Sequence, residues 1–216
     1  MSSNDLDTAR DRIIEAAGEI FAERGFEATT VRDICQAAAA NIAAVNYYFG
    51  DKQRLFVETV LTAHRWRMDQ AALPNWTADT PPRKKLADFI ATFIRRVRTG
   101  PKDTWQNRLI MREMMRPDAA CAEVVRDSIR PQFEILLGIL RALLPEDTSA
   151  ESLHLTAFSI VGQCLFYHFA DPVVRHLVDD IEYAEFSIDK LACHIANFSL
   201  AALEYTARHV DAETAT

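Results

Sequence analysis

Residues 41–49 carry side chains that could recognise the base pairs of DNA. The amide of Asn46 holds a hydrogen-bond donor and an acceptor, which together match the N6 and N7 atoms of adenine in the major groove. Ala43 and Ala44 are small enough to touch thymine methyl groups. Nearby polar groups are better suited to phosphates, which position a protein without specifying a sequence. The remaining candidate DNA contacts are Asn41, Thr29, Arg32, Tyr47, Tyr48 and Lys52.

Two short helices joined by a tight turn would hold these side chains in place. Thr30 is a good N-cap for the first helix, and Thr30 with Asp33 resembles a capping box with aspartate in place of glutamate. Asn41 is a good N-cap for the second helix, in which Val45 and Phe49 are four residues apart and would face the core. This is the layout of a helix-turn-helix, whose second helix enters the major groove. A solvated helix face is the alternative interpretation of Asn46 and Tyr47.

A longer helix precedes this pair and another follows it. The first helix, from about Thr8 to Arg24, has an apolar stripe at helical spacing. Gly25 follows it at a position that favours a left-handed C-terminal cap. The later helix begins at the cap residue Asp51 and continues to about Leu73. The preceding helix would support the pair, as a helix-turn-helix requires.

The sequence beyond residue 73 predicts long helices that are separated by prolines. No alternating strand pattern, internal repeat or low-complexity tract is visible, and the chain has only 6 glycines and 8 prolines. The expected fold is therefore all-α, with about nine helices. After the segments described above, helices are expected over about 82–98, 103–115, from after Pro117 to Leu144 with a bend at Pro131, 150–169 and 183–209.

Three runs in the N-terminal part resemble the TetR family of bacterial regulators. They are Ile20-Phe-Ala-Glu-Arg-Gly-Phe26, Thr29-Thr-Val-Arg-Asp-Ile34 and Asn46-Tyr-Tyr-Phe-Gly-Asp-Lys52. The resemblance is strong over residues 10–60, and the helical remainder agrees with the family in length and rhythm. A motif of this length has a far lower chance rate than a short pattern.

Two positions differ from the family pattern. Ala39 stands in the turn, where the family usually has glycine, and an alanine is strained there if its φ is positive. Tyr48 stands where the family often has histidine before the terminal phenylalanine. Tyrosine keeps an aromatic ring with a polar tip, so a hydrogen bond to a phosphate remains feasible.

The resemblance implies a helix-turn-helix DNA-binding domain over residues 1–55 and a helical ligand-binding and dimerisation domain over 56–216. Residues 107–114, followed by Pro117, are similar to the CecR-like subgroup of the family. The implied function is that of a transcriptional regulator, most commonly a repressor. It would bind a near-palindromic operator as a dimer and leave it when a small-molecule effector binds. No cofactor is expected.

Aromatic and methionine residues of the C-terminal part would suit a bulky, mostly apolar ligand. Gln163 and His168 are candidate polar anchors, and an ordinary helical core is the alternative interpretation of the set. The candidate ligand-binding residues are Phe89, Phe93, Trp105, Met111, Met114, Phe133, Gln163, Phe166, Tyr167 and His168.

The last two long helices are the expected dimer face. Both are rich in apolar side chains, and two from each subunit would form a four-helix interface with two-fold symmetry. The stripes are Leu153, Ala157, Ile160, Val161, Cys164 and Leu165 on the first helix, and Leu191, Ile195, Phe198, Ala202 and Tyr205 on the second.

The charge distribution allows DNA binding, although the net charge is −7. Six acidic and two basic residues occupy residues 1–23, whereas residues 24–68 hold six basic and four acidic residues. We therefore expect modest non-specific affinity for DNA. No apolar run approaches the roughly 20 residues of a membrane span, and the N-terminus lacks the features of a secretory signal. The expected location is the cytoplasm.

An all-helical enzyme and a helical adaptor without specific DNA binding are the alternative functions. No G-x-S-x-G, phosphate-binding glycine loop or H-E-x-x-H occurs, so no catalytic residue is expected. His168 and His176 flank Asp171, which is weak support for a metal site, and no metal is expected. The four cysteines are widely spaced and are interpreted as buried apolar residues.

Overall fold

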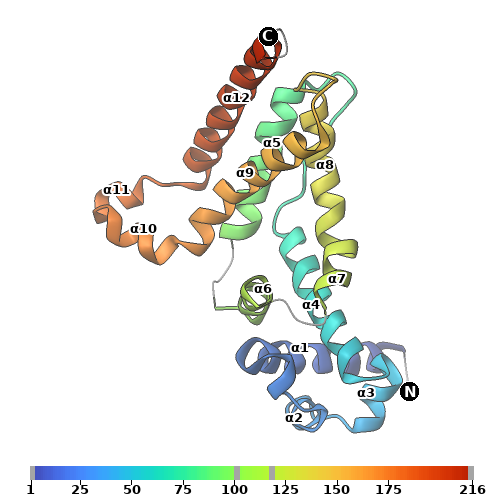
Figure 1. Cartoon of the computed structure of the whole chain (residues 1–216). Helices are drawn as coiled ribbons and strands as arrows, with labels where there is room; N and C mark the ends of the chain where they lie inside the picture. The colour runs from blue at the N-terminus through green and yellow to red at the C-terminus, as the bar shows by residue number, and fades with distance from the viewer. Residues whose placement is uncertain (1–2, 100–102, 117–119, 214–216) are drawn as a thin grey trace. The chain divides into compact units, whose positions relative to one another are not determined.

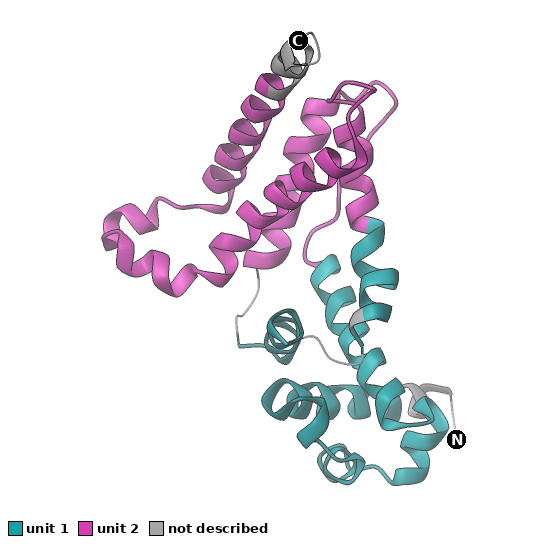
Figure 2. Ribbon diagram, viewed as in Figure 1, with its two compact units in different colours: residues 1–69, 100–131 teal, residues 70–99, 132–216 magenta. Residues whose placement is uncertain are grey.

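The computed structural model describes residues 3–99, 103–116 and 120–213, and all regular structure in these ranges is helical (Figure 1). The predicted all-α fold is confirmed. The chain forms two compact units: unit 1 comprises residues 1–69 and 100–131, and unit 2 comprises residues 70–99 and 132–216 (Figure 2). The functional boundary predicted near residue 55 lies within unit 1, and it stays a prediction.

Unit 1 combines the N-terminal helices with elements from the middle of the chain. Its first helix has non-helical backbone angles at Gly25, with φ of 80° and ψ of 176°, so the regular segment ends where the sequence predicts. The fourth helix ends at Asp69 rather than near Leu73. The elements are α1 (Ser3–Ala28), α2 (Val31–Ala37), α3 (Ile42–Phe49), α4 (Lys52–Asp69), α6 (Trp105–Met115), α7 (Cys121–Val124) and the π-helical turn η1 (Val125–Ile129).

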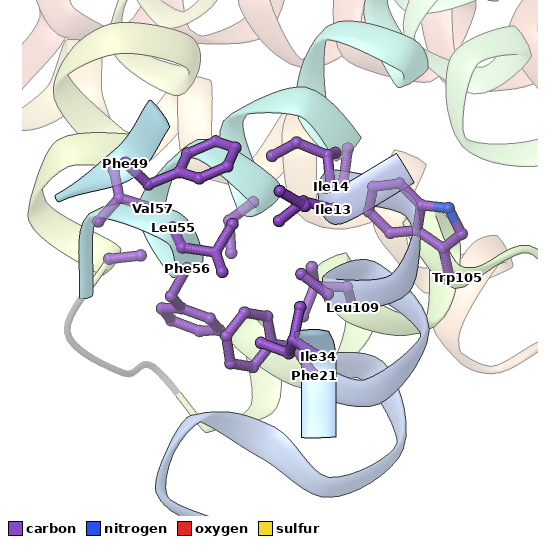
Figure 3. Packing of buried hydrophobic residues seen from close by; sticks show 14 of the residues in the cluster. Ile13, Ile14, Phe21, Ile34, Phe49, Leu55, Phe56, Val57, Trp105 and Leu109 are labelled. Atoms are coloured by element: carbon purple, nitrogen blue, oxygen red, sulfur yellow. The ribbon is translucent and has the colours of Figure 1, made fainter. Parts of the chain in front are cut away.

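Apolar side chains of α1, α2, α3, α4 and α6 share one core in unit 1 (Figure 3). The rings of Phe21 on α1 and Phe56 on α4 meet edge to face, with centroids 4.8 Å apart. Trp105 of α6 is buried against α1 at Gly18, where an added Cβ would lie 2.3 Å from indole carbons. Only glycine leaves room for the indole at this position.

Unit 2 is built around α5, α8, α9 and α12, whose apolar faces meet in a second core. Helices α5 and α9 have the bounds that the sequence predicts. Burial of leucine, isoleucine and phenylalanine from these helices removes apolar surface from water, which stabilises the unit. The elements are α5 (Pro82–Arg98), α8 (Arg130–Arg141, with residues 132–141 in unit 2), α9 (Ala150–Phe169), α10 (Asp171–Leu177), α11 (Asp180–Ala184) and α12 (Ile188–Glu213).

The region around Pro131 forms a π-helical turn instead of a simple bend. The N–H of Arg130 donates to the carbonyl of Val125, five residues earlier. Proline has no N–H and cannot continue the regular hydrogen-bond ladder, so the wider turn lets the chain remain helical. Residues 117–119, where the sequence places a break, lie outside the described ranges.

Helices α10 and α11 were not predicted, and α12 begins at Ile188 rather than near Tyr183. Asp171 is buried and accepts hydrogen bonds from Arg98 Nη1 at 3.3 Å, from Arg175 Nε at 3.2 Å and from the Tyr183 hydroxyl. This network fixes both short helices to the end of α5. It also gives Asp171 two arginine partners, which is a structural role in place of the metal ligation considered from the sequence.

Two cysteines occupy the buried positions expected of them, and a third does not. Cys35 and Cys164 are buried, and burial raises the pKa of the Cys164 thiol to about 12. Cys193 is exposed on α12, so the prediction was wrong for this residue. In the described part of the chain, no helix is both long and apolar enough to cross a membrane.

Candidate DNA-binding helix-turn-helix

Helix α2 begins with the capping box that the sequence predicts. The backbone N–H of Asp33 donates to Thr30 Oγ1 at 3.2 Å, and the N–H of Thr30 donates to Asp33 Oδ2 at the same distance. These bonds satisfy two backbone donors that helix geometry leaves free. The hydrogen bonds from Thr30 also stabilise the carboxylate and so lower the pKa of Asp33.

The turn between α2 and α3 passes through a left-handed residue. Ala39 has a φ of 48°, whereas a residue with a Cβ rarely adopts a positive φ. The N–H of Ala40 donates to the carbonyl of Cys35 at 2.9 Å, which closes the turn tightly. The strain expected from the alanine at this position is therefore present in the fold.

Helix α3 (Ile42–Phe49) has Asn41 as its N-cap, as predicted, and Gly50 as its C-cap. The N–H of Ala44 donates to Asn41 Oδ1 at 2.8 Å, and Gly50 has a φ of 82°. Val45 and Phe49 are buried in the core of unit 1, which confirms the predicted inner face. Because this face is fixed by packing, the opposite face of α3 is held in a defined orientation.

The outer face of α3 carries the residues predicted to contact bases. Asn46 and Ala43 are exposed, and Tyr47 is 78% exposed, the largest fraction for an aromatic residue in the described part of the chain. Ala44 and Tyr48 are partly buried and pack against the core. The structure therefore brings one amide, small side chains and a phenol together on the accessible face of a rigid helix.

Two basic residues lie on the helices that precede and follow α3. Lys52, the first residue of α4, is partly buried and places Nζ 4.3 Å from the centroid of the Phe26 ring. The contact is a cation–π interaction, which holds the ammonium group beside the helix-turn-helix. Arg32 is exposed on α2. Both side chains are compatible with the predicted phosphate contacts.

Thr29 has a structural role instead of the phosphate contact expected from the sequence. Its side chain is buried at 1% exposure, and its hydroxyl donates to the carbonyl of Gly25 at 2.7 Å. The hydroxyl thus supplies a hydrogen-bond donor to the Gly25 carbonyl, which the end of the helix leaves without a regular backbone partner. A phosphate cannot reach this group without disrupting the turn.

Arginine side chains of α6 support the end of α1, and sequence patterns did not indicate them. Arg112 donates through Nη2 to the carbonyl of Arg24 at 3.1 Å and through Nη1 to that of Glu23 at 3.5 Å. A Cβ on Gly25 would lie 2.3 Å from the Arg112 guanidinium. Gly25 therefore provides both the positive φ and the space for this cap.

The candidate ligand-binding residues fall in both units. Trp105, Met111 and Met114 belong to unit 1, and the other seven belong to unit 2. Trp105 packs on Gly18 in the core, which corrects its expected place in a ligand-binding surface. In unit 2, Phe89 is buried, Phe166 is exposed, and the remaining side chains are partly buried: Phe93, Phe133, Gln163, Tyr167 and His168.

Most residues of the two expected dimer stripes face the core of unit 2. Leu153, Ala157, Ile160 and Cys164 on α9 are buried, as are Leu191 and Ile195 on α12. Phe198, Ala202 and Tyr205 are exposed, as an interface would need. Sequence periodicity found an apolar side of each helix but could not separate the side that packs within the subunit from the side left outside.

Comparison with known proteins agrees with this geometry. The family model of bacterial regulatory proteins of the tetR family matches residues 13–59. The model of the C-terminal domain of the HTH-type transcriptional dual regulator CecR matches residues 82–203, more than half of the chain. The CecR protein of Shigella flexneri is 26% identical over 204 residues, covering 87% of this chain and 89% of that protein.

Solved structures share the same fold. A TetR-like regulator from Rhodococcus sp. RHA1 has a TM-score of 0.61 at 19% identity, covering 91% of this chain and 96% of that one. The TetR family regulator PfmR from Thermus thermophilus has a TM-score of 0.55 at 21% identity, covering 88% and 98%.

The capped helix pair and its accessible outer face define a helix-turn-helix DNA-binding protein. More narrowly, the chain belongs to the TetR family of bacterial transcriptional regulators, and its C-terminal region is of the CecR type. It is a regulator of transcription and not an enzyme.

Proposed function

We propose that the protein is a repressor that binds a near-palindromic operator as a homodimer in the cytoplasm and leaves it when a bulky, mostly apolar effector binds. The observation that carries the proposal is the outer face of α3, where Asn46, Tyr47 and Ala43 are exposed together. Small side chains allow the helix to approach the base edges closely, and Asn46 supplies a pair of hydrogen-bonding groups.

Two subunits are needed because one short recognition helix reads few base pairs. The exposed apolar residues of α9 and α12 supply a surface for pairing: Leu155, Phe158, Phe166, Phe198 and Tyr205. A hollow of about 270 Å³ between these helices is bordered by Gln163 and Phe198. A face that offers both an aromatic side chain and a hollow suits a two-fold interface, in which each subunit presents the same patch.

The base-reading role of Asn46 is tested by comparing operator and random DNA. Asn46→Ala should lower operator affinity by about 5- to 150-fold, equivalent to roughly 1–3 kcal/mol for one lost bidentate base contact, and change random-DNA affinity little. Asn75→Ala, which removes an exposed amide in unit 2, is the matched control and should change neither affinity. Equal losses on both DNAs for Asn46→Ala would refute base reading.

The phosphate role of Lys52 predicts a different signature. Lys52→Ala should weaken binding to all sequences alike and reduce the slope of log affinity against log salt by about 0.9 per subunit. Lys84→Ala, on α5 of unit 2, should leave the slope unchanged. An unaltered slope for Lys52→Ala would remove this residue from the phosphate contacts.

Release by an effector follows from a difference in affinity. A ligand can shift the protein from its DNA-binding state only by the amount that it prefers the other state. Titration of an operator complex with a cognate effector should therefore lower operator affinity. If a ligand that binds tightly left that affinity unchanged, the proposed mechanism of release would fail.

A further inference from the structure

His64 of α4 is a buried polar side chain without a hydrogen-bond partner. It is 8% exposed, and none of the hydrogen bonds made by the described residues involves its imidazole. In the same part of the chain, the fully enclosed nitrogen and oxygen atoms that lack a partner belong to other side chains, so the nitrogens of His64 keep access to open space. Buried polar groups normally have a partner, so the missing one requires an explanation.

The imidazole of His64 is neutral at pH 7. Burial, and secondarily the charge of Arg67, lower the pKa of His64 to about 4. A neutral imidazole carries one N–H donor and one nitrogen acceptor. Burial of these groups without partners is unfavourable, whereas an apolar side chain in the same place would avoid the cost. The histidine therefore suits a partner that comes from outside the chain.

A cavity of about 210 Å³ lies beside His64 within unit 1. Its wall on α4 includes Val60 and His64, which are four residues apart and so share one face of that helix. Another wall is the π-helical turn η1, and such turns occur often at functional sites. The residues that line the cavity include Val60, His64, Glu113, Met114, Val125 and Ile129.

The cavity is apolar and reaches the surface. Met114, Val125 and Ile129 line it and are also exposed, whereas Val60 is completely buried. Large apolar side chains that are exposed together indicate a binding surface more often than scattered ones do. An apolar molecule can therefore enter from solvent between these side chains and reach His64.

The charges of the lining residues favour an uncharged ligand. Glu113 is the one charged residue of the lining, and it already interacts with another residue. An anionic ligand would lose its hydration and find no opposite charge in the cavity, which is strongly unfavourable. A cationic ligand would have to compete with the present partner of Glu113.

We propose that this cavity binds a phenol, with the hydroxyl group hydrogen-bonded to His64 and the ring packed among Val60, Met114 and Val125. A hydroxyl both donates and accepts, so it can pair with either nitrogen of a neutral imidazole. An apolar cavity of about 150 Å³ accommodates benzene, so this larger one has room for a ring with a substituent. The thioether of Met114 favours an aromatic ring over an aliphatic chain.

This site goes beyond the proposed function, because the effector proposed above is bulky. The cavity is smaller than the roughly 300–1,000 Å³ of typical drug-sized sites. Of the ligand-binding residues expected from the sequence, the site includes only Met114.

The test measures binding of phenol and toluene to the full chain without DNA, by titration calorimetry. The two probes have similar shapes and differ in a hydroxyl group against a methyl group. The ratio of phenol to toluene affinity should fall by about 2- to 12-fold in His64→Leu, the usual contribution of one hydrogen bond. His64→Gln keeps a donor and an acceptor and should retain most of the ratio. Benzoate should bind at least about 10-fold more weakly than phenol.

Matched variants separate the site from general effects on the protein. His176→Leu removes an exposed histidine of unit 2 and should leave the ratio unchanged. Val125→Phe, which fills the cavity, should weaken both probes, whereas Val173→Phe on α10 should change neither. Because His64→Leu removes a polar group without a partner, it should melt at the wild-type temperature or higher. An unchanged ratio in His64→Leu, or unchanged affinities in Val125→Phe, would overturn the site.

Binding at this site and binding to DNA are tested independently. If phenol binds through His64 and operator affinity is unaffected, the site stands as a ligand site that is separate from DNA release. If the chain binds its operator and neither phenol nor toluene binds the chain, the site is rejected and the DNA-binding function stands.

Discussion

Ala39 adopts a backbone conformation that glycine reaches without a steric penalty. Left-handed backbone costs a residue with a Cβ about 1–2 kcal/mol, whereas glycine loses more entropy on folding by about 0.5–1 kcal/mol. The difference favours glycine slightly. With alanine at position 39, the turn of this helix-turn-helix is therefore less stable than it would be with glycine.

We predict that Ala39→Gly raises the free energy of unfolding by about 0.5–1 kcal/mol. Urea denaturation followed by circular dichroism measures the change. Ala37→Gly is the matched control, because Ala37 is exposed at the end of α2 and has ordinary helical angles, so this change should destabilise by up to about 1 kcal/mol. A loss of stability in Ala39→Gly as large as in the control would contradict the argument.

Local capping residues were predictable from sequence, and residues defined by distant contacts were not. Thr30 and Asn41 bond to backbone groups three residues away, so their roles follow from spacing alone. Thr29 was misassigned because its burial depends on how the chain leaves Gly25 and packs on the core. Arg67 of α4 is buried, and nothing in the sequence distinguishes a buried arginine from a solvated one.

At the scale of elements, the contact between α1 and α6 depends on a glycine, Gly18, which has no side chain. Gly18 lies within α1, where alanine would stabilise an isolated helix by about 1 kcal/mol. The indole of Trp105 occupies the space that the alanine methyl group needs. Packing therefore outweighs helix propensity at this position.

Gly18→Ala should lower the free energy of unfolding by about 1–3 kcal/mol, the usual cost of overpacking a core. Denaturation of Gly18→Ala in the wild type and in a Trp105→Leu background measures the coupling, and the cost should fall in the second background. Gly138→Ala on α8 is the control, because a Cβ there meets nothing within 4 Å, and it should be neutral or stabilising. Equal costs in both backgrounds would show that the indole is not responsible.

Element boundaries followed from sequence where a residue marks them chemically. The prolines at 81 and 82 and Ser149 before α9 are such markers, and α5 and α9 have the predicted bounds. Helices α10 and α11 are short, and their position depends on the buried Asp171 and its partners, which periodicity cannot reveal. The sequence predicted only a bend at Pro131, because several different local backbone conformations can accommodate a proline in a helix.

At the scale of the whole molecule, the proposed dimer requires Phe198 to lie in the interface. This residue is 60% exposed on α12 and borders the hollow between α9 and α12. An exposed aromatic at the centre of an interface is a common source of binding energy. Phe198→Glu leaves the core of unit 2 intact but would place a charge in a desolvated contact.

We expect Phe198→Glu to weaken dimerisation by about 2 kcal/mol or more, roughly 30-fold, and to weaken operator binding with it. Sedimentation at several protein concentrations measures the dimer constant. Ile181→Glu on α11 is the control, since Ile181 is 82% exposed and lies outside the proposed interface. If the Phe198 variant stays as dimeric as this control, the interface lies elsewhere.

The overall organisation was only partly readable from the sequence. The all-α fold and the helix-turn-helix followed from composition, caps and periodicity. The membership of α6 in the same compact unit as α1 to α4 did not, because it depends on contacts between residues that are about 90 positions apart in the chain, such as Arg112 with Glu23 and Arg24. Long-range packing of this kind leaves no periodic trace.

The interleaving of the two units has a consequence for building and evolving chimeric regulators. The compact unit that holds the recognition helix needs residues 100–131 as well as the N-terminal 69, so one crossover near residue 55 or 69 would pair Gly18 and Gly25 with another protein's version of α6. Exchange of DNA specificity between relatives should therefore succeed either by replacing the outer face of α3 alone or by moving both segments together. A single junction would preserve every helix, but it would pack α1 of one protein against α6 of another.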